Sequence, residues 1–430
     1  MFNIQDIFIF LLGILSTGVS VNVSCGDFVK ILYLCPRFPT SRARGDAVRT
    51  YQQLEALKDH DVTFVSFDDG EVKPEHINNL KKFCKEVYLA PLPKERRGVV
   101  TSTLSLNQIK LGIKFLFSSL PFQVNFYQHE SMVKLLQELN RKEKFDVLWV
   151  CLERMAEYAK YVDAKVKVLD YVDSLSLNVF RRMKAEKNIL WKIYCFIDYP
   201  RLFAYEKKQA EVFDELIFIS SVDKKHIGSR KSTLIPTAID LAEFNDSKYE
   251  NIIREKGRII FLGRMDYAPN ISAVLWFAKK IFPLIKKEVD YAKFYIVGAN
   301  PPDKVKNLAD NEDIFVTGFV KDRVAELYKS EVSVAPLRIS SGIQTKVLEA
   351  LAAKLPVVCT SQVAEPIGFS EKEGVFVGDT EEEIARKTVY LLKNKVKFSN
   401  RKLRENFSKE AVLKKYCDLL KQIEKEVKHG

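Results

Sequence analysis

The sequence predicts an α/β protein with two domains, each built on a parallel β-sheet that is covered by helices on both faces. Apolar runs typical of strands alternate with amphipathic helical patterns along nearly the whole chain. These runs are continuously apolar, which indicates strands buried on both faces, as in parallel sheets. Twelve such runs are too many for one doubly wound sheet of ordinary size, and 430 residues suffice for two or three domains. Two Rossmann-like domains follow.

The first half of the chain contains six predicted strands. They cover residues 29–36, 61–67, 86–92, 146–151, 166–172 and 215–220. Helical patterns separate them, for example at 45–60 and at 189–213, where Pro200 can kink the helix.

The second half repeats this scheme with six more strands. They cover residues 258–263, 292–298, 314–320, 332–337, 355–360 and 374–378. Helices are predicted at 271–289 and 322–330, and the chain ends in one uninterrupted amphipathic helix. The polar, turn-rich stretch 235–257 is the expected domain boundary.

Residues 1–27 form a hydrophobic N-terminal extension that does not fit the globular pattern. Its apolar run at 7–15 is short for a spanning helix, and the opening MFNIQD lacks the positive charge of a signal peptide. Three interpretations stay open: a start assigned upstream of the real domain, a weak membrane anchor and a cleaved signal.

The composition excludes several classes of function. A net charge of +12 can suit nucleic acid, anionic lipid or a phosphorylated substrate, but no nucleic-acid-binding motif or dense basic run is present. Seven scattered cysteines without a CxxC pair indicate reduced thiols in a cytosolic protein. The five histidines form no zinc motif. The glycine fingerprint of dinucleotide reductases, the P-loop and the GxSxG elbow are also missing from the sequence.

Ligands of parallel sheets bind beyond the carboxyl ends of the strands, so the loops there matter most. The loop after the strand at 258–263 reads GRMDYAPN. Gly263 permits close backbone approach, Arg264 can bind phosphate oxygens, and Asn270 can cap a helix that begins at Ile271. The alternative is an ordinary capped turn.

The segment APLRISSGIQTKVLEALAAKLPVVC places charges in an otherwise buried region. Gly342 is expected to open a helix whose free amides, near Gly342 and Ile343, make an anion site. Lys346 lies one turn along, within reach of a phosphate, and Glu349 follows one turn later, where a carboxylate can accept hydrogen bonds from ribose hydroxyls. Arg338 adds a second cation. The alternative is an exposed Lys346–Glu349 ion pair without function.

Several stretches in order resemble one family. FLGRMDYAPNISAVLWF, YIVGANPP, VTGFVKD and VSVAPLRISSGIQTKVLEALAAKLPVV are similar to the C-terminal domain of family-4 retaining glycosyltransferases of the GT-B fold. The closest resemblance is to the exosortase-associated bacterial sugar transferases, which ILYLCPRFP, DYVDSLS and IPTAIDLAEF also resemble. The resemblance covers roughly residues 29–425.

The resemblance implies two Rossmann-like domains whose parallel sheets face each other across a cleft. The implied segments are an acceptor domain at 28–238, a nucleotide-sugar donor domain at 239–410 and a C-terminal helix at 411–430 that crosses back to the first domain. Glu349 matches the family's ribose-binding glutamate. The family's other glutamate, eight positions earlier, is Ser341 here, which leaves the usual contact to the donor sugar without its carboxylate.

The expected reaction moves a hexosyl-type sugar from a nucleoside diphosphate sugar to a glycan or lipid-linked acceptor in polysaccharide or glycoconjugate biosynthesis. Arginine, lysine and a helix N-terminus can stabilise a leaving diphosphate in place of Mg²⁺, so we expect no metal and no other cofactor. By resemblance, the anomeric configuration is retained, and the donor phosphate can take the acceptor's proton.

On the acceptor side, Gly45, Asp46 and Arg49 lie at a helix start that is expected to face the cleft, and Asp173 follows a strand. Asp46 is the tentative catalytic base; its alternative role is a favourable charge at a helix N-terminus.

Two other functions fit the same fold. One is a sugar-nucleotide epimerase, and the other is a catalytically silent partner that binds a sugar nucleotide. We expect a cytoplasmic protein, with peripheral contact to anionic membrane at the inner face suggested by the basic charge, and no nucleic-acid partner.

Overall fold

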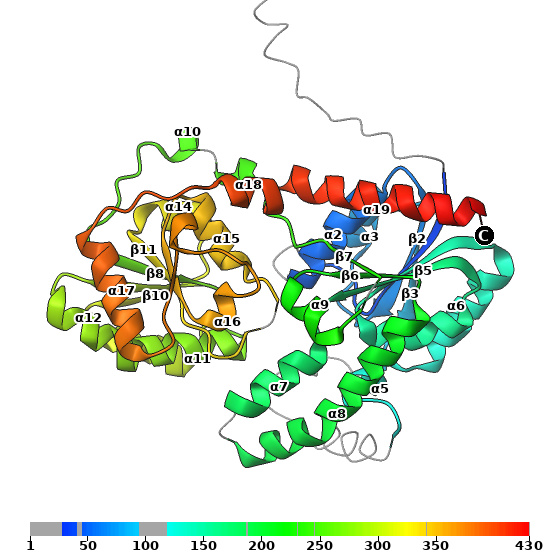
Figure 1. Ribbon diagram of the computed structural model, residues 1–430, viewed down its shortest axis with the longest axis horizontal. Coiled ribbons are helices and arrows are strands. Elements are labelled where there is room, and N and C mark those ends of the chain that lie inside the picture. Colours follow the sequence, from blue (N-terminus) through cyan, green and yellow to red (C-terminus); the bar gives the residue numbers. More distant parts are fainter. Residues whose placement is uncertain are drawn as a thin grey trace, which may run out of the picture.

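The computed structural model shows two α/β domains side by side (Figure 1). It describes residues 28–40, 45–93, 118–185, 188–229, 231–244, 246–340 and 342–429. The predicted N-terminal extension, 1–27, and Ser341 lie outside these residues.

The first domain is built on a seven-stranded parallel sheet of order β3-β2-β1-β4-β5-β6-β7. Its strands are β1 (Lys30–Cys35), β2 (Asp61–Asp68), β3 (Glu86–Pro91), β4 (Phe145–Cys151), β5 (Ala164–Val172), β6 (Glu215–Phe218) and β7 (Ser232–Leu234). All six strands predicted in this half are confirmed. The short edge strand β7 was not predicted, because three residues with one apolar side chain carry no periodic signal.

Helices cover both faces of this sheet and bury two apolar layers. They are α2 (Gly45–Leu57), α3 (Pro74–Leu80), α5 (Phe122–Tyr127), α6 (Glu130–Lys142), the 3-10 helix η2 (Glu153–Tyr161), α7 (Leu175–Ala185), α8 (Ile189–Val212) and α9 (Ser221–Ile227). The helices α7 and α8 form a pair that extends away from the sheet (Figure 1).

The second domain has a six-stranded parallel sheet of order β10-β9-β8-β11-β12-β13. Its strands are β8 (Arg258–Leu262), β9 (Lys293–Val297), β10 (Ile314–Gly318), β11 (Val332–Ala335), β12 (Val357–Cys359) and β13 (Val375–Val377). These are the six strands predicted for this half, so the prediction of two parallel-sheet domains is confirmed.

Two short helices of the second domain precede its first strand, and the other helices follow the strands. They are η3 (Leu241–Phe244), α10 (Asp246–Tyr249), α11 (Ala268–Trp276), the π-helix η4 (Phe277–Ile281), α12 (Phe282–Glu288), α13 (Asp303–Lys306), η5 (Asn307–Asp310), α14 (Arg323–Lys329), α15 (Thr345–Ala352), α16 (Ser361–Ala364), η6 (Glu371–Glu373), α17 (Glu381–Lys393) and α18 (Arg401–Phe407). The single helix predicted at 271–289 contains a π-helical turn. Pro283, which lacks an N–H, lies just after this turn and disfavours an unbroken α-helical ladder.

The C-terminal helix α19 (Lys409–His429) returns to the first domain and lies along it (Figure 1). Its Tyr416 is buried there beside Trp149, with ring centroids 6.3 Å apart, and accepts a hydrogen bond from Gln53 at 3.2 Å. The chain passes between the domains twice, and an isolated β-bridge between Ile239 and Ser408 connects these two segments. The six described cysteines are free and buried, as predicted.

Candidate functional site

The carboxyl ends of the two sheets meet across the domain boundary. The loop after β11 touches the first domain at Gly342, where an added Cβ would lie 2.5 Å from Ile219 and 3.5 Å from the Cβ of Asp173. Arg181 of α7 donates to the carbonyl of Ser340 at 3.1 Å and pairs with Glu365 at 3.6 Å. Ligands of parallel sheets bind at this edge, so the loops gathered here form the candidate site.

Lys346 is a half-buried charged group at this edge. Its Nζ donates to Asn270 Oδ1 at 2.6 Å and lies 4.4 Å from the ring centroid of Phe261. Burial lowers the pKa of Lys346 to about 7, although the charge of Glu349 opposes this shift. A bound anion such as a phosphate would stabilise the ammonium form of Lys346 and raise its pKa again.

Gly263 lies directly beside the side chains of Lys346 and Asn270. A Cβ at Gly263 would lie 2.8 Å from Asn270 Nδ2 and 3.0 Å from Lys346 Nζ. Gly298, after the neighbouring strand β9, approaches even closer, because its Cβ would lie 1.9 Å from the Gly263 carbonyl oxygen. The structure therefore packs the Gly263 backbone tightly against Asn270, Lys346 and a second glycine, Gly298, that the sequence analysis missed. The approach of a ligand to Gly263 stays a prediction.

Asn270 does not cap a helix, contrary to the expectation. Helix α11 begins at Ala268 with Tyr267 as its N-cap, so Asn270 lies inside the first turn. Its buried side chain instead donates to the Arg264 carbonyl at 2.8 Å and accepts from Lys346. Asn270 thus links the loop after β8 to helix α15.

The expectation that Gly342 opens the helix is also wrong. Gly342 has a φ of 55°, which favours glycine, and α15 begins three residues later at Thr345 with Gln344 as its N-cap. The backbone at Gly342 and Ile343 therefore belongs to the interdomain loop. The free amides of the helix N-terminus are those of Thr345 and Lys346.

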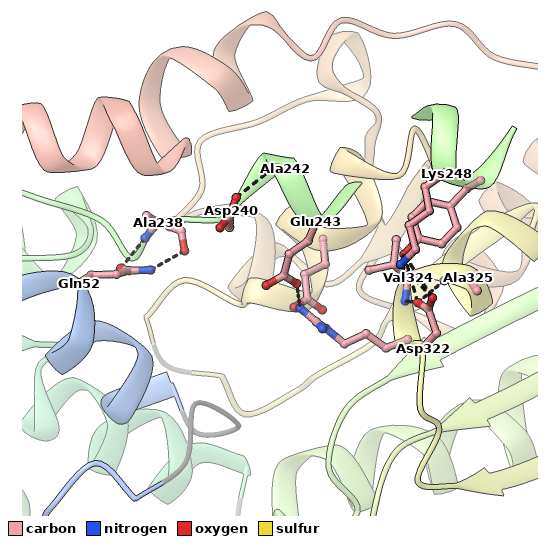
Figure 2. Close-up of polar contacts among 12 residues, drawn as sticks. Gln52, Ala238, Asp240, Ala242, Glu243, Lys248, Asp322, Val324 and Ala325 are labelled. Carbon is pink, nitrogen blue, oxygen red and sulfur yellow. Dashed lines mark hydrogen bonds and ion pairs between the residues drawn. The ribbon is translucent and has the colours of Figure 1, made fainter. Parts of the chain in front are cut away.

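Glu349 lies one turn beyond Lys346, with 18% of its side chain exposed. It accepts from Arg323 Nε at 3.3 Å, and Arg323 also donates to Glu243 at 2.6 Å; Figure 2 shows Glu243 in this contact. Burial raises the pKa of Glu349, while Arg323 opposes the shift. Lys346 and Glu349 thus have different partners, which contradicts the alternative of an exposed pair.

The other two predicted cations lie on the surface. Arg264 is exposed and pairs with Asp266, with Nε to Oδ1 at 3.0 Å. Arg338 is exposed and its guanidinium stacks 4.7 Å from the ring centroid of Trp276. Both follow carboxyl ends of strands, but neither side chain contacts Lys346 or Glu349 among the contacts of the described residues.

On the first domain, Arg49 is not available to an acceptor. It is fully buried, and it donates to both oxygens of Asp170, at 2.6 and 2.9 Å, and to the Ile235 carbonyl at 2.9 Å. Arg49 lies on the buried face of α2 and not on a face open to solvent. Its hydrogen bonds connect α2 to β5 and to the segment that follows β7.

The remaining predicted acceptor residues are more accessible. Gly45 begins α2 with open space around it, and Asp46 in the first turn accepts from the Ala47 amide at 3.0 Å. Asp173 is half-buried beside Gly342 and accepts from Asn178 at 2.7 Å.

The sequence analysis missed two arginines beyond the carboxyl ends of β1 and β4. Arg37 and Arg154 each have a buried Nε–H without an acceptor among the described residues. The Arg154 guanidinium lies 5.8 Å from the Tyr127 ring centroid, and Tyr127 is also the strongest electrostatic neighbour raising the pKa of Arg37. Isolated arginines after two separate strands give no sequence signal, because only the sheet topology brings these strand ends together.

Comparison with known proteins finds a similarity to glycosyltransferases in the second domain. Residues 256–394 match the family described as "Glycosyl transferases group 1". A Klebsiella pneumoniae protein described as an uncharacterized 44.6 kDa protein in the cps region is 24% identical over 380 residues, covering 85% of this chain and 91% of that protein.

Solved structures share the fold of both domains. Sucrose-phosphate synthase from Thermosynechococcus elongatus aligns with a TM-score of 0.64 at 14% identity, covering 92% of this chain and 99% of that one. Anabaena HepE in complex with UDP gives 0.58 at 13% identity, with 91% and 100% covered. A mutant of S. aureus TarM in complex with Fondaparinux, α-GlcNAc-glycerol and UDP gives 0.63 at 12% identity, with 91% and 100% covered. The chain thus has the GT-B fold.

Within the described part of the chain, no helix combines the length and apolar character needed to cross a bilayer.

Proposed function

We propose that this chain is a retaining, metal-independent glycosyltransferase that moves a hexosyl group from a nucleoside diphosphate sugar to a glycan or lipid-linked acceptor. The observation that carries the proposal is the enclosed amine of Lys346 beside Gly263, with Glu349 one turn further along α15. The similarity to proteins crystallised with UDP and the cps-region relative support a nucleotide-sugar donor and polysaccharide biosynthesis. These similarities do not favour an epimerase or a silent partner.

On the donor side, Lys346 and the free amides of Thr345 and Lys346 would hold the diphosphate. Arg264 and Arg338 would turn from their surface partners toward it. Glu349 would accept hydrogen bonds from the ribose hydroxyls. Burial raises the pKa of Glu349, and its present partner Arg323 opposes this rise.

In the transfer step, the bond between the anomeric carbon and the diphosphate oxygen breaks, and the acceptor oxygen bonds to that carbon on the same face. The acceptor's proton passes to the departing phosphate oxygen. The protein contributes charge stabilisation of the leaving group and alignment of the acceptor hydroxyl. Asp46 would act as an acceptor contact or as the base, because its partly exposed carboxylate lies at the same edge of the first sheet.

On the acceptor side, we place the acceptor at the carboxyl ends of β1, β4 and β5. Asp173 can bind a hydroxyl there, and the unpaired Nε–H groups of Arg37 and Arg154 favour an anionic group such as a phosphate.

The test is product analysis by NMR, after incubation of the protein with nucleoside diphosphate sugars and with diphosphate-linked lipid acceptors. We expect a glycoside with the anomeric configuration of the donor, formed in the presence of EDTA. Arg154→Gln should raise KM for the acceptor without changing donor affinity. An inverted product, or transfer that stops with EDTA, would contradict the mechanism, and the absence of any transfer or hydrolysis would favour the silent partner.

A further inference from the structure

The outer face of helix α8 carries a row of exposed apolar side chains. Ile189, Leu190, Ile193, Phe196 and Ile197 are 65%, 74%, 50%, 72% and 39% exposed. Their spacing of three to four residues puts them on neighbouring positions of one helix face. These five residues are called the α8 stripe below. A cluster of this size on the surface marks an interaction site.

The fold does not use this face. The opposite side of α8 packs on α7 through a separate small core formed by Leu175, Val179, Cys195 and Leu202. Because this core holds the helix pair together, the stripe stays uncovered on a pair that extends away from the sheet (Figure 1).

The charges around the stripe are positive. Lys184, Lys192, Lys207 and Lys208 are exposed on α7 and α8. Between residues 175 and 210, the carboxylates of the described residues are Asp198 and Glu206, which are 2% and 0% exposed. The face therefore offers apolar side chains and ammonium groups to a partner, and the exposed carboxylate of Glu211 lies at the far end of α8, in its last turn.

We propose that the α8 stripe docks on an anionic phospholipid bilayer. The helix would lie in the plane of the interface, with the apolar side chains among the upper acyl chains and the lysines among the phosphates. Trp191 lies outside the stripe, on the side of α8 that faces α7, where it stacks 4.3 Å from the Arg182 guanidinium. A second copy of the chain is disfavoured as occupant, because two such faces would bring together more lysines than the carboxylate of Glu211 on each copy could pair. The proposal rests on the proposed function only in that a docked enzyme would meet a lipid-linked acceptor.

A tryptophan placed in the stripe allows a local test on the full chain. The chain's own three tryptophans lie outside the stripe: Trp149 is 0% exposed, Trp276 lies in the second domain at 8%, and Trp191 faces α7. We expect vesicles of brominated phosphatidylcholine with phosphatidylglycerol to quench the fluorescence of Phe196→Trp strongly and that of the wild type little. Brominated phosphatidylcholine alone should quench much less. Quenching of Phe196→Trp that is absent, or that is no stronger than in the wild type, would overturn the proposal, even if residues 1–27 bind the vesicles.

Paired variants separate lipid docking from general stickiness. Leu190→Gln/Phe196→Gln should lower the partition coefficient onto anionic vesicles by roughly tenfold or more, and Lys207→Gln/Lys208→Gln by roughly tenfold at low salt. The matched control Ile253→Gln/Phe319→Gln changes side chains that are 86% and 78% exposed away from the stripe, and it should bind as the wild type does. Equal binding by all variants would contradict the proposal. A wild-type dimer that Leu190→Gln/Phe196→Gln turns into a monomer would show a second copy as the partner.

Nucleotide binding by the same proteins keeps the two proposals distinguishable. We expect the stripe variants to bind nucleoside diphosphates as the wild type does. Lipid docking without any nucleotide binding would contradict the proposed function and would still support docking of the α8 stripe on the bilayer.

Discussion

Lys346 and Asn270 join the two loops that form the candidate donor site. The ammonium of Lys346, in the first turn of α15, donates to the side-chain oxygen of Asn270 in α11 at 2.6 Å. Asn270 in turn holds the Arg264 carbonyl at 2.8 Å. Lys346 is therefore connected through Asn270 to the loop that follows β8.

Binding of a donor should be linked to proton uptake by Lys346. In the free protein, burial lowers the pKa of this amine to about 7, so it is mostly neutral at pH 8. A bound diphosphate diester has no proton to titrate near this pH and favours the ammonium form. We expect uptake of about 0.9 proton at pH 8 and an affinity that falls as the pH rises above 7.

Calorimetric titration with a nucleoside diphosphate sugar, in buffers of different ionisation enthalpy, measures this uptake. Lys346→Met should bind weakly and without it. The same heats in all buffers for the wild type would show that Lys346 does not meet the diphosphate.

Gly263→Ala should damage donor binding more than folding. The added Cβ would crowd Asn270 Nδ2 and Lys346 Nζ, which are ends of side chains and can move aside. Affinity should fall about tenfold or more, because the amine leaves its place. Gly298→Ala should instead lower the melting temperature strongly, since its Cβ would meet the backbone at Gly263, which cannot yield. Thermal melts and titrations of both variants check this contrast, and equal affinity of Gly263→Ala and the wild type would contradict it.

Arg323→Gln should make donor binding sensitive to mild acid. Arg323 opposes the rise in the pKa of Glu349 that burial causes, so its removal raises that pKa further. Below the new pKa, the carboxyl is protonated and accepts fewer hydrogen bonds from a ribose. We expect the Kd of Arg323→Gln to rise between pH 7 and pH 5 more than that of the wild type. Glu349→Gln should show no such added dependence, and parallel curves for all three proteins would count against a ribose contact.

Arg49→Met should destabilise the first domain, because it leaves the buried carboxylate of Asp170 without its cation. Removing one partner of a buried pair costs about 3–5 kcal/mol, measurable as the free energy of unfolding in urea. The control Lys144→Met breaks an exposed pair with Asp163 and should change nothing measurable. A stable Arg49→Met protein with a raised KM for the acceptor would restore Arg49 to the acceptor site.

The sequence predicted the strands well and the side-chain contacts poorly, for a physical reason. Buried strands between helices leave long apolar runs, so all twelve predicted strands exist, whereas the three-residue β7 leaves none. Gly342 shows the limit of local pattern. The same residue type can start a helix or turn a loop, and here contact with Ile219 of the other domain accompanies the loop.

The partners of the site residues were beyond prediction because they are distant in the chain. Arg323 lies 26 residues before Glu349, and Asn270 lies 76 residues before Lys346. Helical spacing placed Lys346 and Glu349 on one face, which made an ion pair between them a reasonable alternative. In the fold, Lys346 and Glu349 instead bond to these distant partners and not to each other.

The central claim is that the edge of the second sheet binds a nucleoside diphosphate through Lys346 and Glu349. The most direct measurement is calorimetric titration of a panel of nucleoside diphosphates into the wild type, Glu349→Gln and the control Glu312→Gln, whose carboxylate lies on an exposed loop of the same domain. We expect one nucleotide to bind the wild type and Glu312→Gln equally, and to bind Glu349→Gln at least tenfold more weakly. Equal binding to all three proteins, or none to the wild type, would contradict it.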